Sequence, residues 1–236
     1  MKEADKVSNS SDSVRGQRDA ETQGSPIRHN RPYVLGINGS PSPNSTTERL
    51  LRDTLAAAEE SGAEVVLVHA RDYVNVFHDG RRDEDLPMEE RINNLPSEGL
   101  KQIVRLIFQA DGVIWATPVN GMGPHARIST LMHWLFTTID SPEYALAGKV
   151  AGLMAVCEID GASMAMAQMR EQLAHLGFDF PSYATHYYYN KSAVGNDEEG
   201  WMETDKVLPG RNVVRRIRVN RGEIKPGNWN DPSNSW

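Results

Sequence analysis

Residues 38–47 (NGSPSPNSTT) join a strand end to a dense cluster of hydroxyl and amide side chains. Six of the eight positions from 40 to 47 carry such a side chain: Ser40, Ser42, Asn44, Ser45, Thr46 and Thr47. An apolar run precedes them and apolar residues at helical spacing follow, so we expect them at a helix N-terminus. Free backbone N–H groups and the helix dipole attract anions there, and hydroxyls add hydrogen bonds. The cluster predicts an anion-binding loop; the alternative is that these residues only cap the helix.

The kind of anion chemistry follows from what the loop lacks. It contains no lysine, so the phosphate-transferring pattern GxxxxGK[ST] is absent. Gly36 and Gly39 are not followed by a third glycine, so the dinucleotide fingerprint GxGxxG is absent too. Without a lysine or a magnesium ligand, the loop suits holding a phosphate better than transferring one. No serine lies in a GxSxG pattern, so hydrolase chemistry has no support.

Alternating apolar patterns predict the elements that must position this loop. Five β-rich runs predict strands at residues 33–37, 64–69, 112–116, 150–156 and 183–187. Helices are expected at residues 44–61, from Ser97, from Pro124, at 162–176 and at 203–219, the last interrupted by Pro209. Residues 71–96 form the one long irregular connection, a candidate lid or partner contact. The alternation predicts an α/β fold in which helices cover both faces of a parallel sheet.

In such sheets, ligands bind beyond the C-terminal ends of the strands. The loops after the first, third and fourth strands read NGSPSPNSTT (residues 38–47), TPVNGMG (117–123) and CEIDGAS (157–163). All three are rich in small residues and hydrogen-bonding groups. We therefore expect these loops to form one ligand site.

Two of these segments resemble those of the NADPH-dependent FMN reductase family. The order strand–GSPxxNSTT–helix, then ADGVIWATPV at residues 110–119, then a helix from about Pro124, is similar to the family pattern over residues 33–187. The resemblance implies a flavodoxin-like three-layer α/β/α sandwich with five parallel strands in the order 2-1-3-4-5. It also implies the cofactor FMN, a partner nicotinamide NAD(P)H, a small electron acceptor such as a quinone or flavin, and a homodimer or homotetramer.

The resemblance also implies roles for the site residues. The hydroxyl cluster of the first segment would hold the FMN phosphate. The second segment would line the flavin ring, and the third would approach the ring or ribityl chain from the other side. The cofactor-binding residues expected in these two segments are Thr117, Pro118, Val119, Asn120, Gly121, Met122, Asp160 and Gly161. No catalytic side chain and no metal ligand is expected.

Three departures from the family pattern matter. The frequent arginine after GSP is Ser42 here, which removes a cation from the loop. The aromatic residue often found after TPV is Asn120, so contacts with the ring must come from elsewhere, such as a partner subunit. Related iron–sulfur flavoproteins carry a cysteine cluster after the second strand, and this segment has no cysteine. These departures leave open an electron-transfer protein without nicotinamide turnover, or a scaffold that has lost the cofactor.

The composition of the chain excludes several other classes of protein. The net charge of -7 argues against a nucleic-acid binder, and the basic run at residues 211–221 is expected to be a solvated helix face. The single cysteine, Cys157, excludes an intrachain disulfide and is expected to be buried and inert. No apolar run reaches the length of a membrane span, and we expect a cytoplasmic protein. Residues 1–31 are expected to be a disordered leader or an oligomerisation arm, residues 32–221 the flavodoxin-like FMN-binding domain and residues 222–236 a C-terminal tail. His125 is an open candidate for contact with the ligand.

Overall fold

The computed structural model describes residues 30–225, apart from residues 82, 84, 140–144 and 190–198. The strands are β1 (Tyr33–Asn38), β2 (Glu64–His69), β3 (Gly112–Asn120), β4 (Gly123–Pro124), β5 (Val150–Cys157) and β6 (Thr185–Tyr189). The helices are α1 (Thr46–Glu60), α2 (Ala70–Tyr73), α3 (Met88–Asn93), α4 (Glu98–Gln109), α5 (Ala126–Ile139), α6 (Ala162–His175) and α8 (Glu199–Asn220). Nearly all of the expected leader, and the tail beyond residue 225, lie outside the described residues. None of the described helices is both long and apolar enough to cross a lipid bilayer.

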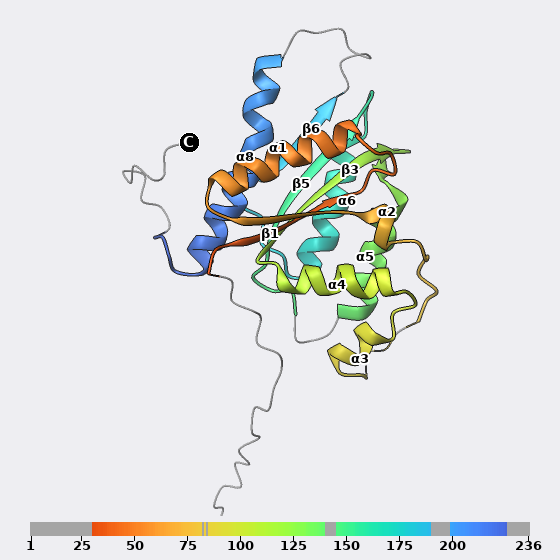
Figure 1. Ribbon diagram of the computed structural model, residues 1–236. Helices are drawn as coiled ribbons and strands as arrows, with labels where there is room; N and C mark the ends of the chain where they lie inside the picture. Colours follow the sequence, from red (N-terminus) through yellow and green to blue (C-terminus); the bar gives the residue numbers. More distant parts are fainter. Residues whose placement is uncertain (1–29, 82, 84, 140–144, 190–198, 226–236) are drawn as a thin grey trace, which may run out of the picture.

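Five parallel strands form the sheet in the order β2-β1-β3-β5-β6, and the two-residue β4 pairs antiparallel with β3. Because β5 and β6 are the fourth and fifth parallel strands, this is the order expected from the sequence. The carboxyl ends of all five strands share one edge, where the loops after β1, β3 and β5 emerge (Figure 1). We call this the C-terminal edge, and the opposite one the N-terminal edge.

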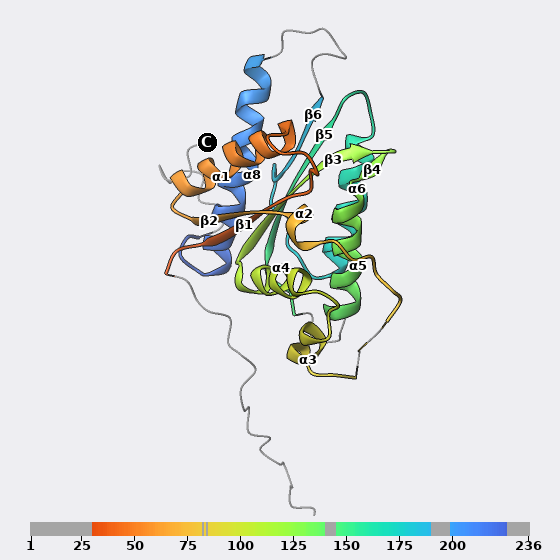
Figure 2. The same ribbon diagram turned by 45° about the vertical axis from the view of Figure 1, so that its right-hand side comes forward.

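Helices cover both faces of the sheet, as Figures 1 and 2 show. α1 and α8 lie on one face and α4, α5 and α6 on the other. Neighbouring strand residues point to opposite faces: Ile114 packs in the cluster under α1 and α8, and Trp115 in the cluster under α4, α5 and α6. β3 is buried over its first six residues because it is central in the sheet.

The last helix runs through Pro209 without a break, so the interruption predicted there is wrong. A proline removes one hydrogen bond from a helix. In the turn before the proline, the Thr54 hydroxyl of α1 donates to the Lys206 carbonyl oxygen at 2.6 Å and joins the two helices. Gly210 allows this approach, since a Cβ atom there would lie only 2.1 Å from the Thr54 carbonyl oxygen. α8 therefore packs closely on α1 on both sides of its proline.

Other boundaries differ from the sequence prediction for local reasons. Thr117 and Pro118, expected in a loop, continue β3 because they pair with β5, and the next two residues pair with β4. Pro124 belongs to β4 and does not begin the helix, which starts at Ala126. The sixth strand starts late because Tyr183 has a φ of 53°, which an extended strand does not allow. The segment 71–96, expected to be irregular, carries most of α2 and all of α3.

Candidate functional site

The first loop, residues 39–45, connects β1 to α1, and Ser45 is the N-cap of that helix. Its Oγ accepts a hydrogen bond from the Glu48 N–H at 3.2 Å, and its carbonyl oxygen accepts one from the Arg49 N–H at 3.0 Å. The first N–H groups of a helix have no acceptor within the helix. After these two bonds, the N–H groups of Thr46 and Thr47 remain to face the loop. One hydroxyl is thus enough to cap α1, and the other polar groups are not needed for it.

The six polar residues of the predicted anion loop fall into two groups. Ser40 and Thr47 are buried. The other four are exposed or half-buried at the surface of the loop: Ser42, Asn44, Ser45 and Thr46. The Ser42 N–H donates to the Ser40 Oγ at 3.3 Å, and Asn44 turns the chain with a φ of 53°. The accessible polar atoms therefore surround the free N–H groups at the start of α1.

A buried asparagine and a half-buried histidine support the first loop, and the sequence analysis did not predict this pair. The Ser40 N–H donates to Asn38 Oδ1 at 3.0 Å, and Asn38 Nδ2 lies 3.0 Å from His69 Nδ1. Asn38 is fully buried, and it faces His69 in the register of β1 and β2. The signal in the sequence was a polar residue at the last position of each of two adjacent apolar strands.

The nearest buried charge belongs to Glu48 in the first turn of α1. Its carboxylate accepts hydrogen bonds from Arg52 Nε and Nη2 at 3.0 and 2.7 Å. These bonds lower the pKa of Glu48, and His69 and the Asn44 backbone N–H lower it further. Arg52 itself is largely exposed. Arg52 thus balances the carboxylate beside the loop, which matters because the loop has no arginine of its own.

The second segment is a β-hairpin rather than an open loop. β3 and β4 pair through Val119 with Pro124 and Asn120 with Gly123, and a two-residue turn joins them. Gly121 and Met122 in that turn have φ values of 57° and 68°. Two positive φ angles are typical of the tightest hairpin turns. The turn holds Met122 at the tip, where its side chain is 45% exposed.

The third loop, residues 158–161, packs against this hairpin. Gly161 has a φ of 91°, and a Cβ atom there would lie 2.9 Å from Met122 Cα and 3.0 Å from Val119 Cγ1. Its N–H donates to Asp160 Oδ1 at 2.6 Å. Only glycine fits this contact, both for its backbone conformation and for its size. The hairpin and the third loop therefore touch directly.

The first loop is attached to β3, the strand that carries the hairpin, through Gly39. Its N–H donates to the Ala116 carbonyl oxygen at 2.7 Å, and a Cβ atom there would lie 2.5 Å from Ile128 Cγ1. This contact ties the start of the first loop to the end of β3 and to α5. The structure thus brings the three predicted segments together at the C-terminal edge.

Three exposed apolar side chains gather around the hairpin and the third loop. Met122 stands at the hairpin tip, Ile159 in the third loop and Met164 in the first turn of α6. Thr117, in contrast, is fully buried, and its Oγ1 accepts the His125 N–H at 2.9 Å. Asn120, where the family often has an aromatic residue, is exposed. We call Met122, Ile159 and Met164 the apolar rim.

Two further residues near the site have altered acidity. Burial, and then the charge of Arg127, lower the pKa of His125, whose Nδ1 accepts the Arg127 N–H at 3.2 Å. The neutral ring therefore carries its proton on Nε2. Burial raises the pKa of the Cys157 thiol, which lies under the third loop in a small cluster with Ala162. In the described ranges, no group of three or more potential ligands could hold a metal ion.

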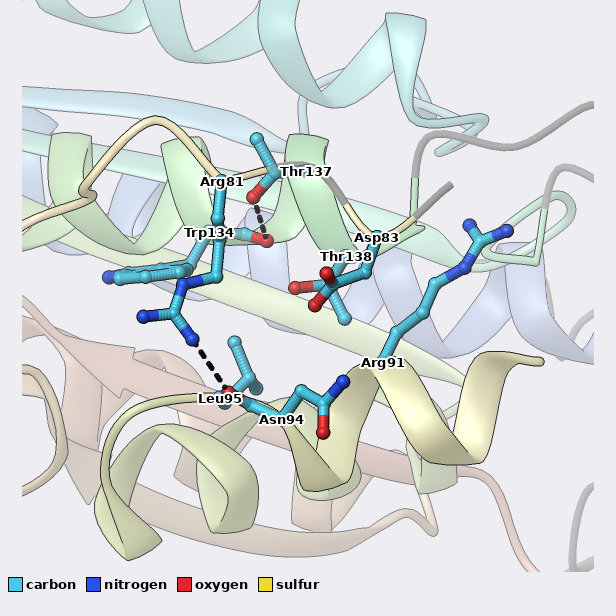
Figure 3. Close-up of a pocket in the computed structure, with 8 residues that line it drawn as sticks. All are labelled: Arg81, Asp83, Arg91, Asn94, Leu95, Trp134, Thr137 and Thr138. Carbon is cyan, nitrogen blue, oxygen red and sulfur yellow. Dashed lines mark hydrogen bonds between the residues drawn. The ribbon is translucent and has the colours of Figure 1, made fainter. Parts of the chain in front are cut away.

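A separate pocket lies between α3 and α5 (Figure 3). Its lining includes Arg81, Arg91 and Trp134, and Arg81 Nη1 donates to the Asn94 carbonyl oxygen at 3.1 Å. It takes no residue from the three loops. This pocket is therefore distinct from the site at the C-terminal edge.

Comparison with known proteins identifies the family. The model of the NADPH-dependent FMN reductases matches residues 32–186. The chain belongs to the NADPH-dependent FMN reductase family. An FMN reductase (NADPH) from Pseudomonas putida is 30% identical over 118 residues, which are 50% of this chain and 50% of that protein. The match thus spans about half of the length of this curated relative.

Solved structures share the fold of this family member. RosB, with bound 8-demethyl-8-formylriboflavin-5′-phosphate, superimposes with a TM-score of 0.68 at 18% identity over 81% of each chain. An oxidoreductase from Corynebacterium diphtheriae gives 0.60 at 13% identity, over 80% of this chain and 98% of that one. The apo form of the NADH:FMN oxidoreductase EMOB gives 0.52 at 20% identity, over 84% and 92%. The flavodoxin-like architecture predicted from the sequence is confirmed.

Proposed function

We propose that this protein binds FMN at the C-terminal edge and is an NAD(P)H-dependent oxidoreductase that passes electrons to a small acceptor. The proposal rests on one observation: a polar surface and an apolar surface lie at the same edge of the sheet. A helix N-terminus with open N–H groups and hydroxyls lies at one end, and a hairpin with an apolar rim lies at the other. FMN likewise has an anionic phosphate at one end and a flat aromatic ring at the other.

The residues of the first loop fit a phosphate. The N–H groups of Thr46 and Thr47 have no acceptor within α1, and the side chains of Ser42, Asn44 and Ser45 add further donors. Arg52 balances Glu48, so the carboxylate does not oppose the phosphate as an isolated charge. Helix N-termini hold phosphates in this way without a lysine.

The hairpin and the third loop fit a flat ring. Residues 118–122 run along one strand and turn, and Gly161 lets the third loop pack directly against that turn. Bound FMN would supply hydride and electron transfer. The chain would hold the ring, orient it and place N–H dipoles where negative charge develops. His125, neutral with its proton on Nε2, is a further donor beside Thr117.

The test is a flavin absorption spectrum during reduction. We expect the purified protein to bind added FMN, and the flavin absorption to bleach on anaerobic addition of NADPH or NADH. Addition of a quinone or of free flavin should then restore the absorption. Bound FMN that neither nicotinamide bleaches would indicate an electron-transfer protein, and failure to bind FMN would indicate a scaffold. Either result would contradict the proposed reductase.

The protein is also proposed to form a homodimer or homotetramer that covers the apolar rim. Exposed apolar side chains next to a ligand site are typical of subunit or ligand contacts. Light scattering tests this, and a monomer at working concentration would contradict it.

A further inference from the structure

We propose that Asn38 and His69 are positioning residues for the first loop, and that this loop keeps its shape only while the His69 ring is neutral. The inference rests on the proposed function for the identity of the ligand, the phosphate of FMN. The coupling between the ring and the loop is a property of the chain itself. No comparison assigns a role to either residue.

The hydrogen bonds determine the tautomer of His69. Because the Ser40 N–H donates to Asn38 Oδ1, the oxygen of the amide faces Ser40 and its nitrogen faces His69. An amide nitrogen only donates, so His69 Nδ1 must accept. The neutral ring then carries its proton on Nε2, which lies 3.9 Å from Glu48 Oε1. One ring thus contacts the support of the loop through Nδ1 and the first turn of α1 through Nε2.

Protonation of His69 breaks this arrangement. An imidazolium carries a proton on both nitrogens, so Nδ1–H would meet the amide N–H group of Asn38. If the amide rotates, its oxygen turns to His69 and its nitrogen meets the Ser40 N–H. Asn38 is fully buried and Ser40 is 3% exposed, so water does not replace the lost bond. A buried donor without an acceptor is costly, and the loop must shift to relieve it.

The same network also reaches the far end of the first loop. The Asn44 backbone N–H helps to lower the pKa of Glu48, and Glu48 is the residue that His69 Nε2 approaches. At the near end, the Ser42 N–H donates to Ser40 Oγ. His69 therefore lies between the supports of both ends of the loop.

The charged groups around His69 allow both protonation states. β1 brings no charged side chain, and α1 brings Glu48 with Arg52 bound to it. α2 brings Arg71 and Asp72, which pair with each other at 3.7 Å. Glu48 Oε1 lies 3.9 Å from His69 Nε2, and Asn38 Nδ2 lies 3.0 Å from His69 Nδ1. Histidine side chains in general change charge between roughly pH 5 and 8, so the experiment covers that range.

Two other effects change FMN binding with pH. An added positive charge near a phosphate strengthens binding on acidification. Protonation of the phosphate near about pH 6 weakens it. The experiment therefore needs a variant that keeps the acceptor at position 69 but does not titrate. His69→Asn is that variant, because the asparagine oxygen can occupy the place of Nδ1. His69→Leu removes the acceptor altogether.

The first measurement needs no flavin. NMR of the ¹⁵N-labelled protein reports the ring nitrogens of His69 and the amides of Ser40 and Ser42 across the titration. We expect the proton on Nε2 at high pH, and Ser40 and Ser42 amide shifts with the same midpoint as His69. In His69→Asn these amides should no longer titrate with that midpoint. A ring proton on Nδ1, or Ser40 amide shifts independent of His69, would overturn the proposal.

The second measurement compares FMN with riboflavin, which lacks the phosphate. At about pH 8, His69→Asn should bind FMN like the wild type, and His69→Leu about three- to tenfold more weakly. At about pH 5.5, the wild type should lose about three- to tenfold more FMN affinity than His69→Asn does. Riboflavin affinity should be equal in all three proteins at each pH.

The outcomes separate the two proposals. Identical pH profiles for the wild type and His69→Asn, or equal losses of FMN and riboflavin affinity in His69→Leu, would overturn the positioning role. In a third outcome, the amide shifts of Ser40 and Ser42 change with the same midpoint as His69, but the protein binds neither FMN nor riboflavin. This result would overturn the proposed function and support the coupling.

Discussion

The two edges of the sheet satisfy their polar groups in opposite ways. At the N-terminal edge, Asp111 accepts hydrogen bonds from the Tyr33 N–H at 2.8 Å and from Arg221 Nη2 at 2.6 Å. Lys149 Nζ donates to the carbonyl oxygens of Phe108 and Ala110, both at 2.6 Å. These donors and acceptors pair with one another and so connect distant segments of the chain. At the C-terminal edge, N–H groups and hydroxyls face outwards around the first loop.

This difference indicates a division of roles, in which the N-terminal edge stabilises the fold and the C-terminal edge binds the ligand. The hydrogen bonds of Asp111 and Lys149 connect β1, β3, β5 and the end of α8 at the N-terminal edge. The donors named there, the Tyr33 N–H, Arg221 Nη2 and Lys149 Nζ, all have acceptors within the chain. The C-terminal edge holds two non-glycine residues with positive φ, Asn44 and Met122, and exposed apolar side chains, which cost stability and suit a ligand. Variants at the two edges should therefore separate unfolding from flavin binding.

The largest expected effect of a single substitution at neutral pH is at Asp111. Asp111→Ala should lower the free energy of unfolding by about 2–3 kcal/mol, because it leaves Arg221 and the Tyr33 N–H without their shared acceptor. Urea denaturation measures this, and FMN affinity at the other edge should stay unchanged. Asp79→Ala, which removes an exposed pair with Arg81, is the control and should change the urea midpoint little. A loss of FMN affinity in Asp111→Ala would contradict the division.

The next effect is a pH dependence at the same edge. Burial lowers the pKa of Lys149 to about 8, partly opposed by Asp111. Between about pH 8 and 10.5 the unfolded chain then binds the proton that the folded chain has lost, so stability rises with pH. The contribution is full above about pH 10.5 and is lost as the pH falls towards 8. Compared with Lys149→Met, the wild type should gain up to about 3 kcal/mol over this range in urea titrations. Parallel pH profiles would refute the assignment.

A matched pair of glycines compares the two edges directly. Gly148 at the N-terminal edge and Gly161 at the C-terminal edge both have positive φ, 83° and 91°. No atom lies within 4 Å of a Cβ atom at Gly148, whereas one at Gly161 meets Met122. Both alanine variants should lose about 1 kcal/mol from backbone strain. Only Gly161→Ala should also weaken FMN binding, by about tenfold, because it displaces the hairpin. Equal FMN affinity in both variants, measured by fluorescence titration, would remove the hairpin from the proposed site.

The sequence predicted what depends on local pattern. The parallel sheet covered by helices followed from the alternation of elements, the strand order followed from the resemblance to the family, and the converging loops followed from the strand ends. It failed where a distant segment decides the local structure. Pro209 lies within a helix that packs on Thr54 of α1, and Asn38 acquires its role only because β2 brings His69 into register. Such contacts are set by the packed fold and leave little trace in the residues on either side.

The smallest expected effect is at the apolar rim. Met122→Ala should leave the urea midpoint nearly unchanged, because the side chain is 45% exposed. It should weaken the binding of FMN and riboflavin alike by about threefold, since it removes apolar surface that the ring would cover. Phe77→Ala is the control: its ring is 77% exposed but lies outside the three loops, so neither affinity should change. If Met122→Ala affected FMN but not riboflavin, the hairpin tip would contact the phosphate end of the ligand, and the proposed orientation along the edge would have to be reversed.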